Sequence, residues 1–198
     1  MAHPFKTIAY AINRFGVINH YWNGKLTLNL IADYTDAISI LNYFNSNLVI
    51  NASTYDISEI EMYGNGDITL SGNGEIGVLR SMLNNNIYVG GFTFNPNPVN
   101  RAFIDDYSVT LDGCLVRGII TIQDCKGTVK LGGLTIYPTF YVDLLRCKAH
   151  VSAIDGDIIA NYCFITRSLA PYINGSHNVI TDMQPLSKVV TVNYNFVS

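Results

Sequence analysis

A three-residue motif, Leu70-Ser71-Gly72, returns along this chain about every 20 residues. In each copy a branched aliphatic residue is followed by any residue and then by glycine. The later copies are Val89-Gly90-Gly91, Leu111-Asp112-Gly113, Leu131-Gly132-Gly133, Ile154-Asp155-Gly156 and Ile173-Asn174-Gly175. Leu30-Ile31-Ala32 and Ile50-Asn51-Ala52 extend the series toward the N-terminus, with alanine in place of glycine. The pattern predicts about eight turns of one repeating unit.

Each unit opens with a short run in which branched or aromatic residues alternate with polar ones, as in 26–30, 68–70, 109–111 and 129–131. This alternation is typical of β-strands, and the small residue after each run suits a tight corner. A second short apolar run follows, such as Phe92-Thr93-Phe94. Short strands without a helix in each unit predict an all-β, parallel β-helix, since the consensus of a leucine-rich repeat is absent. The aliphatic positions 30, 50, 70, 89, 111, 131, 154 and 173 would then stack as an inward column.

The composition limits the classes of protein to consider. Of 198 residues, 48% are hydrophobic and 14% are charged, and the net charge is −3. Such a chain is too apolar for intrinsic disorder, yet no stretch approaches the ~20 apolar residues of a transmembrane helix. The twelve Lys and Arg residues are scattered singly, so neither nucleic-acid binding nor membrane insertion is expected.

The N-terminal residues follow a different pattern. Phe5, Ile8, Ala9, Ile12 and Phe15 fall at helical spacing between Pro4 and Gly16, which predicts a short amphipathic helix. A helix here would cap the open end of the solenoid. We therefore divide the chain into a capping helix and lead-in (1–24), a parallel β-helix (25–183) and a C-terminal strand or cap (184–198).

The cysteines and histidines give no sign of a metal or cofactor site. Cys114, Cys125, Cys147 and Cys163 form no C-x-x-C pair, and the four histidines share no metal-ligand spacing. We expect buried free thiols, with Cys125 stacked on Cys147 because one coil separates them. The glycine-rich segment 72–77 has the G-x-G-x-x-G spacing of a dinucleotide site but lacks the helix that such a site requires.

Several carboxylates recur at close to the coil spacing, namely Asp105, Asp106, Asp124 and Asp143. Stacked acids could supply the acid/base pair of a polysaccharide hydrolase or lyase, with Asp105, Asp106 and Asp124 as the catalytic candidates. The interpretation that we favour is a solvated face with ordinary ion pairs. If Cys125 stacks on Cys147, Asp124 faces Arg146 and not Asp143.

Tyrosines lie in the outer runs and corners of the predicted coils. Together with nearby Asp and Arg side chains, they suit either sugar binding or packing between neighbouring chains. The candidate glycan-binding residues are Asp105, Asp106, Asp124, Tyr137, Tyr141, Asp143 and Arg146.

Three segments resemble tail β-helix domains of phages and prophages from Gram-positive hosts. Residues 5–13 are similar to an F-x-T-I-x-x-A-I helix opening, and residues 23–34 to an N-G-x-V-T-I-N-V-A-x-G-x-Y strand and corner. Residues 64–72 are similar to a G-x-G-x-I-x-I-x-G run. The likeness spans about residues 5–95 and departs at Asp33-Tyr34, where the usual glycine before the tyrosine is missing.

The resemblance implies a right-handed β-helix in a tail fibre, spike or baseplate, usually a homotrimer. Such domains bind host cell-surface polysaccharide, and some cleave it. On this basis we expect an adhesion domain of the virion that acts outside the cell after synthesis in the host cytoplasm, and that contacts other tail or baseplate proteins. A polysaccharide-degrading enzyme and a purely structural trimeric spacer are the alternatives.

Overall fold

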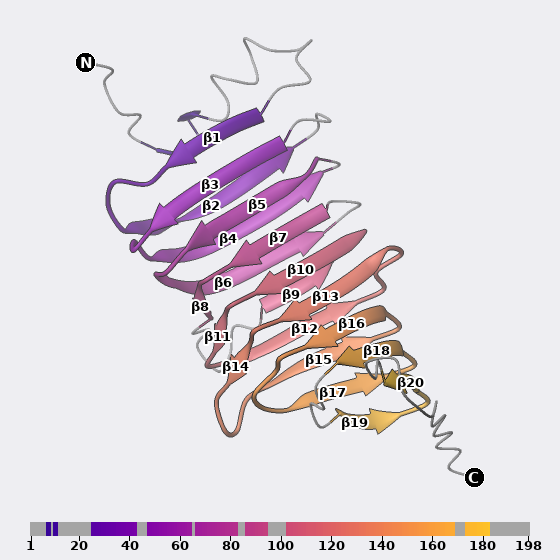
Figure 1. Cartoon of the computed structure of the whole chain (residues 1–198). Coiled ribbons are helices and arrows are strands. Elements are labelled where there is room, and N and C mark those ends of the chain that lie inside the picture. Colours follow the sequence, from indigo (N-terminus) through magenta and orange to yellow (C-terminus); the bar gives the residue numbers. More distant parts are fainter. Residues whose placement is uncertain are drawn as a thin grey trace.

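The computed structural model of the chain describes residues 7–8, 10–11, 25–42, 47–64, 66–82, 86–94, 102–168 and 173–182. Within them the chain forms a right-handed parallel β-helix, which confirms the all-β solenoid predicted from the repeat (Figure 1). Successive turns stack along one axis, and every strand pairing is parallel.

One wall of the solenoid is a nine-stranded sheet in the order β1-β3-β5-β7-β10-β13-β16-β18-β20. Its strands are β1 (Lys25–Asn29), β3 (Asn47–Ser53), β5 (Ile68–Gly72), β7 (Asn86–Gly90), β10 (Ser108–Asp112), β13 (Thr128–Gly132), β16 (Lys148–Ser152), β18 (Phe164–Ser168) and β20 (Val179–Asp182). The chain thus passes through this sheet nine times along its described length.

The other wall is an eleven-stranded sheet. Its strands are β2 (Tyr34–Asn42), β4 (Ile57–Gly64), β6 (Glu75–Met82), β8 (Thr93–Phe94), β9 (Ala102–Asp105), β11 (Leu115–Val116), β12 (Ile119–Gln123), β14 (Thr135–Ile136), β15 (Tyr141–Leu145), β17 (Ile158–Asn161) and β19 (Ile173–Ser176). The long strand β6 pairs with β8 near its start and with β9 near its end. Later turns therefore carry a short and a longer strand on this wall, with a break between them.

The core is a set of stacked aliphatic columns because alternate side chains of each strand point inward. The predicted column is confirmed from Ile50 through Leu70, Val89 and Leu111 to Leu131, which pair in sequence and are at most 1% exposed. At its ends the prediction is wrong. Ile50 pairs with Leu28 rather than Leu30, and Leu131 pairs with Val151 rather than Ile154.

The error at Ile154 and Ile173 arises because the glycines that follow them, Gly156 and Gly175, do not lie at the corner after the nine-stranded sheet. Gly156 and Gly175 belong to the other wall of the solenoid, so Ile173 pairs with Ile158 in the eleven-stranded sheet. The motifs at 154–156 and 173–175 thus have nearly the spacing of the repeat, but they lie at a different position in the turn from the earlier copies.

Two corners of the turn hold residues in the left-handed conformation. The first follows the nine-stranded sheet and contains Ser53, Gly91, Gly113, Gly133 and Ala153, with φ between 51° and 81°. We call it the glycine corner. The second follows the eleven-stranded sheet and contains Asp124, Arg146, Tyr162 and His177, with φ between 51° and 59°. We call it the side-chain corner. At both corners the next residue points inward in most turns, which carries the chain from one wall to the other.

Only part of the expected N-terminal helix lies within the described residues. The amide of Ala11 donates to the carbonyl of Thr7 at 3.1 Å, and the Thr7 hydroxyl accepts from the amide of Tyr10 at 3.1 Å. The second contact is that of a helix N-cap. Ile8 packs against the solenoid core, as expected of a cap, whereas Pro4 and Gly16 lie outside the described residues.

The described solenoid runs from Lys25 to Asp182, and the proposed C-terminal segment, 184–198, lies outside the described residues. No helix in this part of the chain is long and apolar enough to span a membrane.

Candidate functional site

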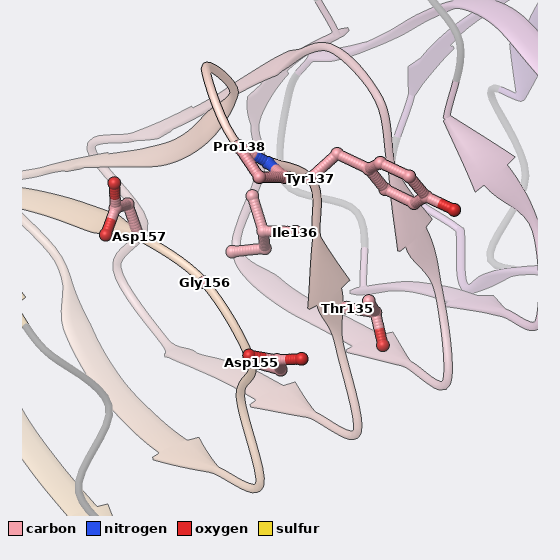
Figure 2. Close-up of a pocket in the computed structure, with 7 residues that line it drawn as sticks. All are labelled: Thr135, Ile136, Tyr137, Pro138, Asp155, Gly156 and Asp157. Carbon is pink, nitrogen blue, oxygen red and sulfur yellow. The ribbon is translucent and has the colours of Figure 1, made fainter.

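A surface pocket lies at the break in the eleven-stranded wall, between β14 and the next turn of the chain. Its volume is about 390 Å³, and it is lined by Thr135, Ile136, Tyr137, Pro138, Asp155, Gly156 and Asp157. Figure 2 shows Asp155 and Asp157 on either side of Gly156, with Ile136 and Pro138 on the neighbouring turn. The pocket thus combines an apolar wall with two exposed carboxylates.

Backbone contacts hold the acidic segment beside β14. The amide of Ile136 donates to the carbonyl of Asp155 at 2.6 Å, and the amide of Asp155 donates to the carbonyl of Leu134 at 2.9 Å. Gly156 is required here because a Cβ at its position would lie 2.4 Å from the Cβ of Ile136, and its φ is +124°. The close approach of Gly156 to Ile136 determines the positions of the Asp155 and Asp157 carboxylates on the surface.

Tyr137 extends this surface toward the preceding turn. Figure 2 shows its ring pointing away from Asp157. The guanidinium of Arg117 lies 4.7 Å from the centre of that ring and donates to the Tyr137 hydroxyl at 3.2 Å. This hydrogen bond raises the pKa of Arg117. Arg117, Asp155 and Asp157 were not among the candidates from the sequence, although Asp155 lies within one of the repeated motifs, Ile154-Asp155-Gly156.

Asp124 and Arg146 meet at the side-chain corner, as the stacking of Cys125 on Cys147 predicts. Two atoms of Arg146, Nε and one terminal nitrogen, donate to the two Asp124 oxygens at 2.6 Å and 2.7 Å. The hydrogen bond from Arg146 lowers the pKa of the Asp124 carboxyl. This carboxylate is therefore engaged in an ion pair.

Asp105 and Asp106 stand at the same end of the sheet, one turn earlier. Asp105 accepts a long contact of 3.5 Å from the Gln123 amide nitrogen, while Asp106 is only 3% exposed. Because Asp106 is buried and Asp124 is paired with Arg146, the three acids do not present a shared open face. They remain untested as catalytic residues.

Tyr141 and Asp143 lie on β15, half-buried on the outer face of the eleven-stranded sheet. Tyr141 stacks on Ile119, and Asp143 lies between Thr121 and Ile159. Of the seven predicted glycan-binding residues, Asp106 alone is buried, and the other six lie on the outer surface of this wall or at its corner.

A second pair of side chains at the side-chain corner escaped sequence analysis. The rings of Tyr162 and His177 stack with centroids 4.6 Å apart and an interplanar angle of 10°. Tyr162 is 60% exposed, so the pair forms a flat aromatic surface accessible to solvent. Their spacing of 15 residues differs from the usual 20, which hid the relationship in the sequence.

The prediction of buried free thiols is confirmed for all four cysteines. Among the described residues, no group of three or more His, Cys, Asp or Glu side chains is arranged to hold a metal ion. The chain was compared with protein-family models, with curated proteins and with solved structures, and none of the three comparisons gives a match.

Proposed function

We propose that this chain is an adhesion domain of a phage or prophage tail fibre, spike or baseplate that binds host cell-surface polysaccharide. The observation that carries the proposal is the pocket at the break in the eleven-stranded wall, with Asp155 and Asp157 opposite Ile136 and Pro138. Carboxylates accept hydrogen bonds from sugar hydroxyls, and an apolar wall suits the C–H faces of a sugar ring. The resemblance of residues 5–95 to tail β-helix domains supports the same function.

The surface around the pocket suits a polymer better than a small molecule. Arg117 and Tyr137 continue it toward one end of the solenoid, and Tyr141 and Asp143 lie on the next strand of the same turn. Polar and aromatic groups thus extend from the pocket both along the stack and around the turn, where they can contact successive sugar units.

The proposal includes a homotrimer attached to other tail or baseplate proteins. On the outer face of the eleven-stranded sheet, the half-buried side chains of Ile119 and Tyr141 pair with each other. Phe103 and Ile159 are half-buried in the adjacent row, where Thr121 and Asp143 lie between them. Half-buried apolar side chains on an outer face favour side-by-side packing of copies, and light scattering tests this proposal.

The proposed site can be tested by measuring binding to a glycan array and to host cells. Asp155→Asn together with Asp157→Asn should weaken binding at least about tenfold, because each variant removes a charged hydrogen-bond acceptor. Asp36→Asn is the matched control, since Asp36 is an exposed carboxylate on β2, distant from the pocket along the stack.

The outcomes separate the proposal from its alternatives. If the double variant binds as well as the wild type, the binding site lies elsewhere on the surface. Failure of the wild-type protein to bind any glycan or host cell would favour a structural spacer. Release of reducing ends from host glycan would show an enzyme, with Asp124→Asn as the first variant to examine.

A further inference from the structure

Three of the four cysteines occupy equivalent places in successive turns. Gln123, Leu145 and Asn161 pair in register at the ends of β12, β15 and β17. Each is followed by a left-handed residue of the side-chain corner and then by Cys125, Cys147 or Cys163. The three thiols therefore form a column, which we call the thiol column, just inside this corner.

The sulfur atoms in the column are directed along the stack. The Cys147 thiol contacts the carbonyl of Ile122, in the preceding turn, at 3.6 Å, and the Cys163 thiol contacts the carbonyl of Leu144 at 3.4 Å. The Cys147 amide also lies 3.4 Å from the sulfur of Cys163. These two sulfurs thus reach carbonyls of the preceding turn as well as those of their own turn, Leu145 at 3.1 Å and Asn161 at 3.3 Å.

Neighbouring thiols are close enough to interact directly. The Cys125 side chain is the largest influence on the pKa of Cys147, so the ionisation of the two thiols is linked. Adjacent strands of a sheet are ~4.8 Å apart, and disulfides form between residues whose Cα atoms are roughly 4.4–6.8 Å apart. A disulfide between adjacent members therefore needs no large backbone movement, whereas Cys125 and Cys163 are two turns apart and cannot be joined.

We propose that Cys125 and Cys147 are a modification site, at which a peroxide converts the two thiols into a disulfide between adjacent turns. The Cys125 thiolate attacks hydrogen peroxide, which breaks the O–O bond, gives the sulfenic acid and releases hydroxide. The Cys147 sulfur then attacks the Cys125 sulfur and expels water as the S–S bond forms. In total, two thiols are oxidised and one peroxide is reduced to two waters.

The surroundings favour Cys125 as the first thiol to react. Cys125 is 6% exposed, against 4% for Cys147 and 3% for Cys163. A hydrogen bond with Cys147 lowers the pKa of Cys125, whereas the same contact raises the pKa of Cys147 to about 11. The thiolate is the reactive form of a cysteine, and reactivity with peroxide follows thiolate character and exposure.

The fourth cysteine provides an internal control. Cys114 follows the glycine corner, and Phe92 and Leu134 occupy the equivalent places in the turns on either side of it. It is 1% exposed, and burial raises its pKa to about 11. Cys114 therefore has no thiol neighbour along its own column.

The experiment treats the folded protein with hydrogen peroxide, blocks remaining thiols and maps tryptic peptides without reduction. Lys126, Arg146 and Lys148 place the three column cysteines on separate peptides. We expect a link between Cys125 and Cys147 in the wild type, in Cys114→Ser and in Cys163→Ser, but not in Cys147→Ser. The link should raise the Tm by about 6–12 °C, because it closes a loop of about one turn, and dithiothreitol should reverse the shift.

Other results would overturn the proposal. A link from Cys147 to Cys163 as the main product, or any link to Cys114, would contradict it. Oxidation to sulfinic acid without a disulfide would show that the turns hold the sulfurs apart. Circular dichroism of Cys147→Ser, compared with that of Cys114→Ser, establishes whether a missing link reflects the lost partner or a misfolded chain.

Discussion

The glycine corner and the side-chain corner require the same backbone conformation but fill it with different residues. Gly91, Gly113 and Gly133 adopt left-handed φ values at one corner, and Asp124, Arg146 and Tyr162 adopt them at the other. A residue with a Cβ loses about 1 kcal/mol or more in this conformation, whereas glycine does not. The residues of the side-chain corner are strained by this amount, but their side chains point outward and form the ion pair and the aromatic stack.

This difference separates two tasks of a solenoid turn. The glycine corner redirects the chain and joins neighbouring turns through the backbone, since the amides of Gly91, Gly113 and Gly133 each donate to a carbonyl of the next turn. The side-chain corner also links neighbouring turns, through Asp124 with Arg146 and through Tyr162 with His177. The glycine repeat, which is the clearest pattern in the sequence, therefore marks the corner with fewer side-chain interactions between turns.

The largest expected effect concerns the inward residues behind the two corners. Phe92 follows the glycine corner and is fully buried, so Phe92→Ala should lower the free energy of unfolding by about 3–5 kcal/mol. Cys147→Ala, behind the side-chain corner, removes one sulfur and should cost about 1 kcal/mol. Urea unfolding measures both values, and equal losses would mean that the larger side chain buried at Phe92 gives no additional stability.

The second prediction compares two glycines of the same corner. A Cβ at Gly91 would lie 2.5 Å from the carbonyl oxygen of Gly72, whereas one at Gly113 would meet nothing within 4 Å. Gly91→Ala should therefore lose about 2–4 kcal/mol, from both strain and a clash, and Gly113→Ala about 1 kcal/mol from strain alone. The midpoint of urea unfolding reports the difference. Similar losses would show that the conformation alone, and not the close approach, requires glycine at position 91.

The third prediction converts one type of corner residue into the other. Ala153 is an exposed member of the glycine corner with φ +51°, so Ala153→Gly should raise the free energy of unfolding by about 1 kcal/mol. Tyr162→Gly removes the same strain but also removes the stack on His177, so its net effect should be smaller than that of Ala153→Gly. Thermal unfolding measures both. A larger gain from Tyr162→Gly would mean that the stack contributes nothing.

The smallest effect is a dependence on pH. Arg146 lowers the pKa of Asp124 in the folded protein below its usual value of 3.8. The stabilisation is therefore present above that value and is lost as the pH falls through the lowered pKa. Asp124→Asn should lower the Tm slightly at pH 7, and the difference from the wild type should shrink toward pH 3. The side chains are 39% and 52% exposed, so solvent screening keeps the effect small.

The sequence was enough to predict the architecture because each turn of a solenoid needs the same inward residues and the same corner residues at similar spacing. The inward column from Ile50 to Leu131 and the meeting of Asp124 with Arg146 followed from spacing alone. At Ile154 the prediction failed because Ala153 replaces glycine at the corner while Gly156 satisfies a different close contact nearby. Glycine spacing does not reveal which contact requires the glycine.

The pocket could not be predicted for a related reason. It depends on where the turn containing Asp155 lies against Ile136, and that placement follows from the register of β14 and from the space left by Gly156. The stack of Tyr162 on His177 was equally hidden, because the last turns are shorter than the earlier ones. In both cases the number of residues in one turn, relative to the next, determines which side chains meet.

The break in the eleven-stranded wall has a consequence for how such a chain can diversify. Between β11 and β12 the break contains Arg117 and Gly118, and between β14 and β15 it spans residues 137–140, yet the strands after it stay in register. Length can therefore change at this position without displacing the hydrogen-bonded ladder on either side. A lineage could replace the loops at this break one turn at a time while the scaffold beneath them stays the same, and an engineer could graft new loops at the same points.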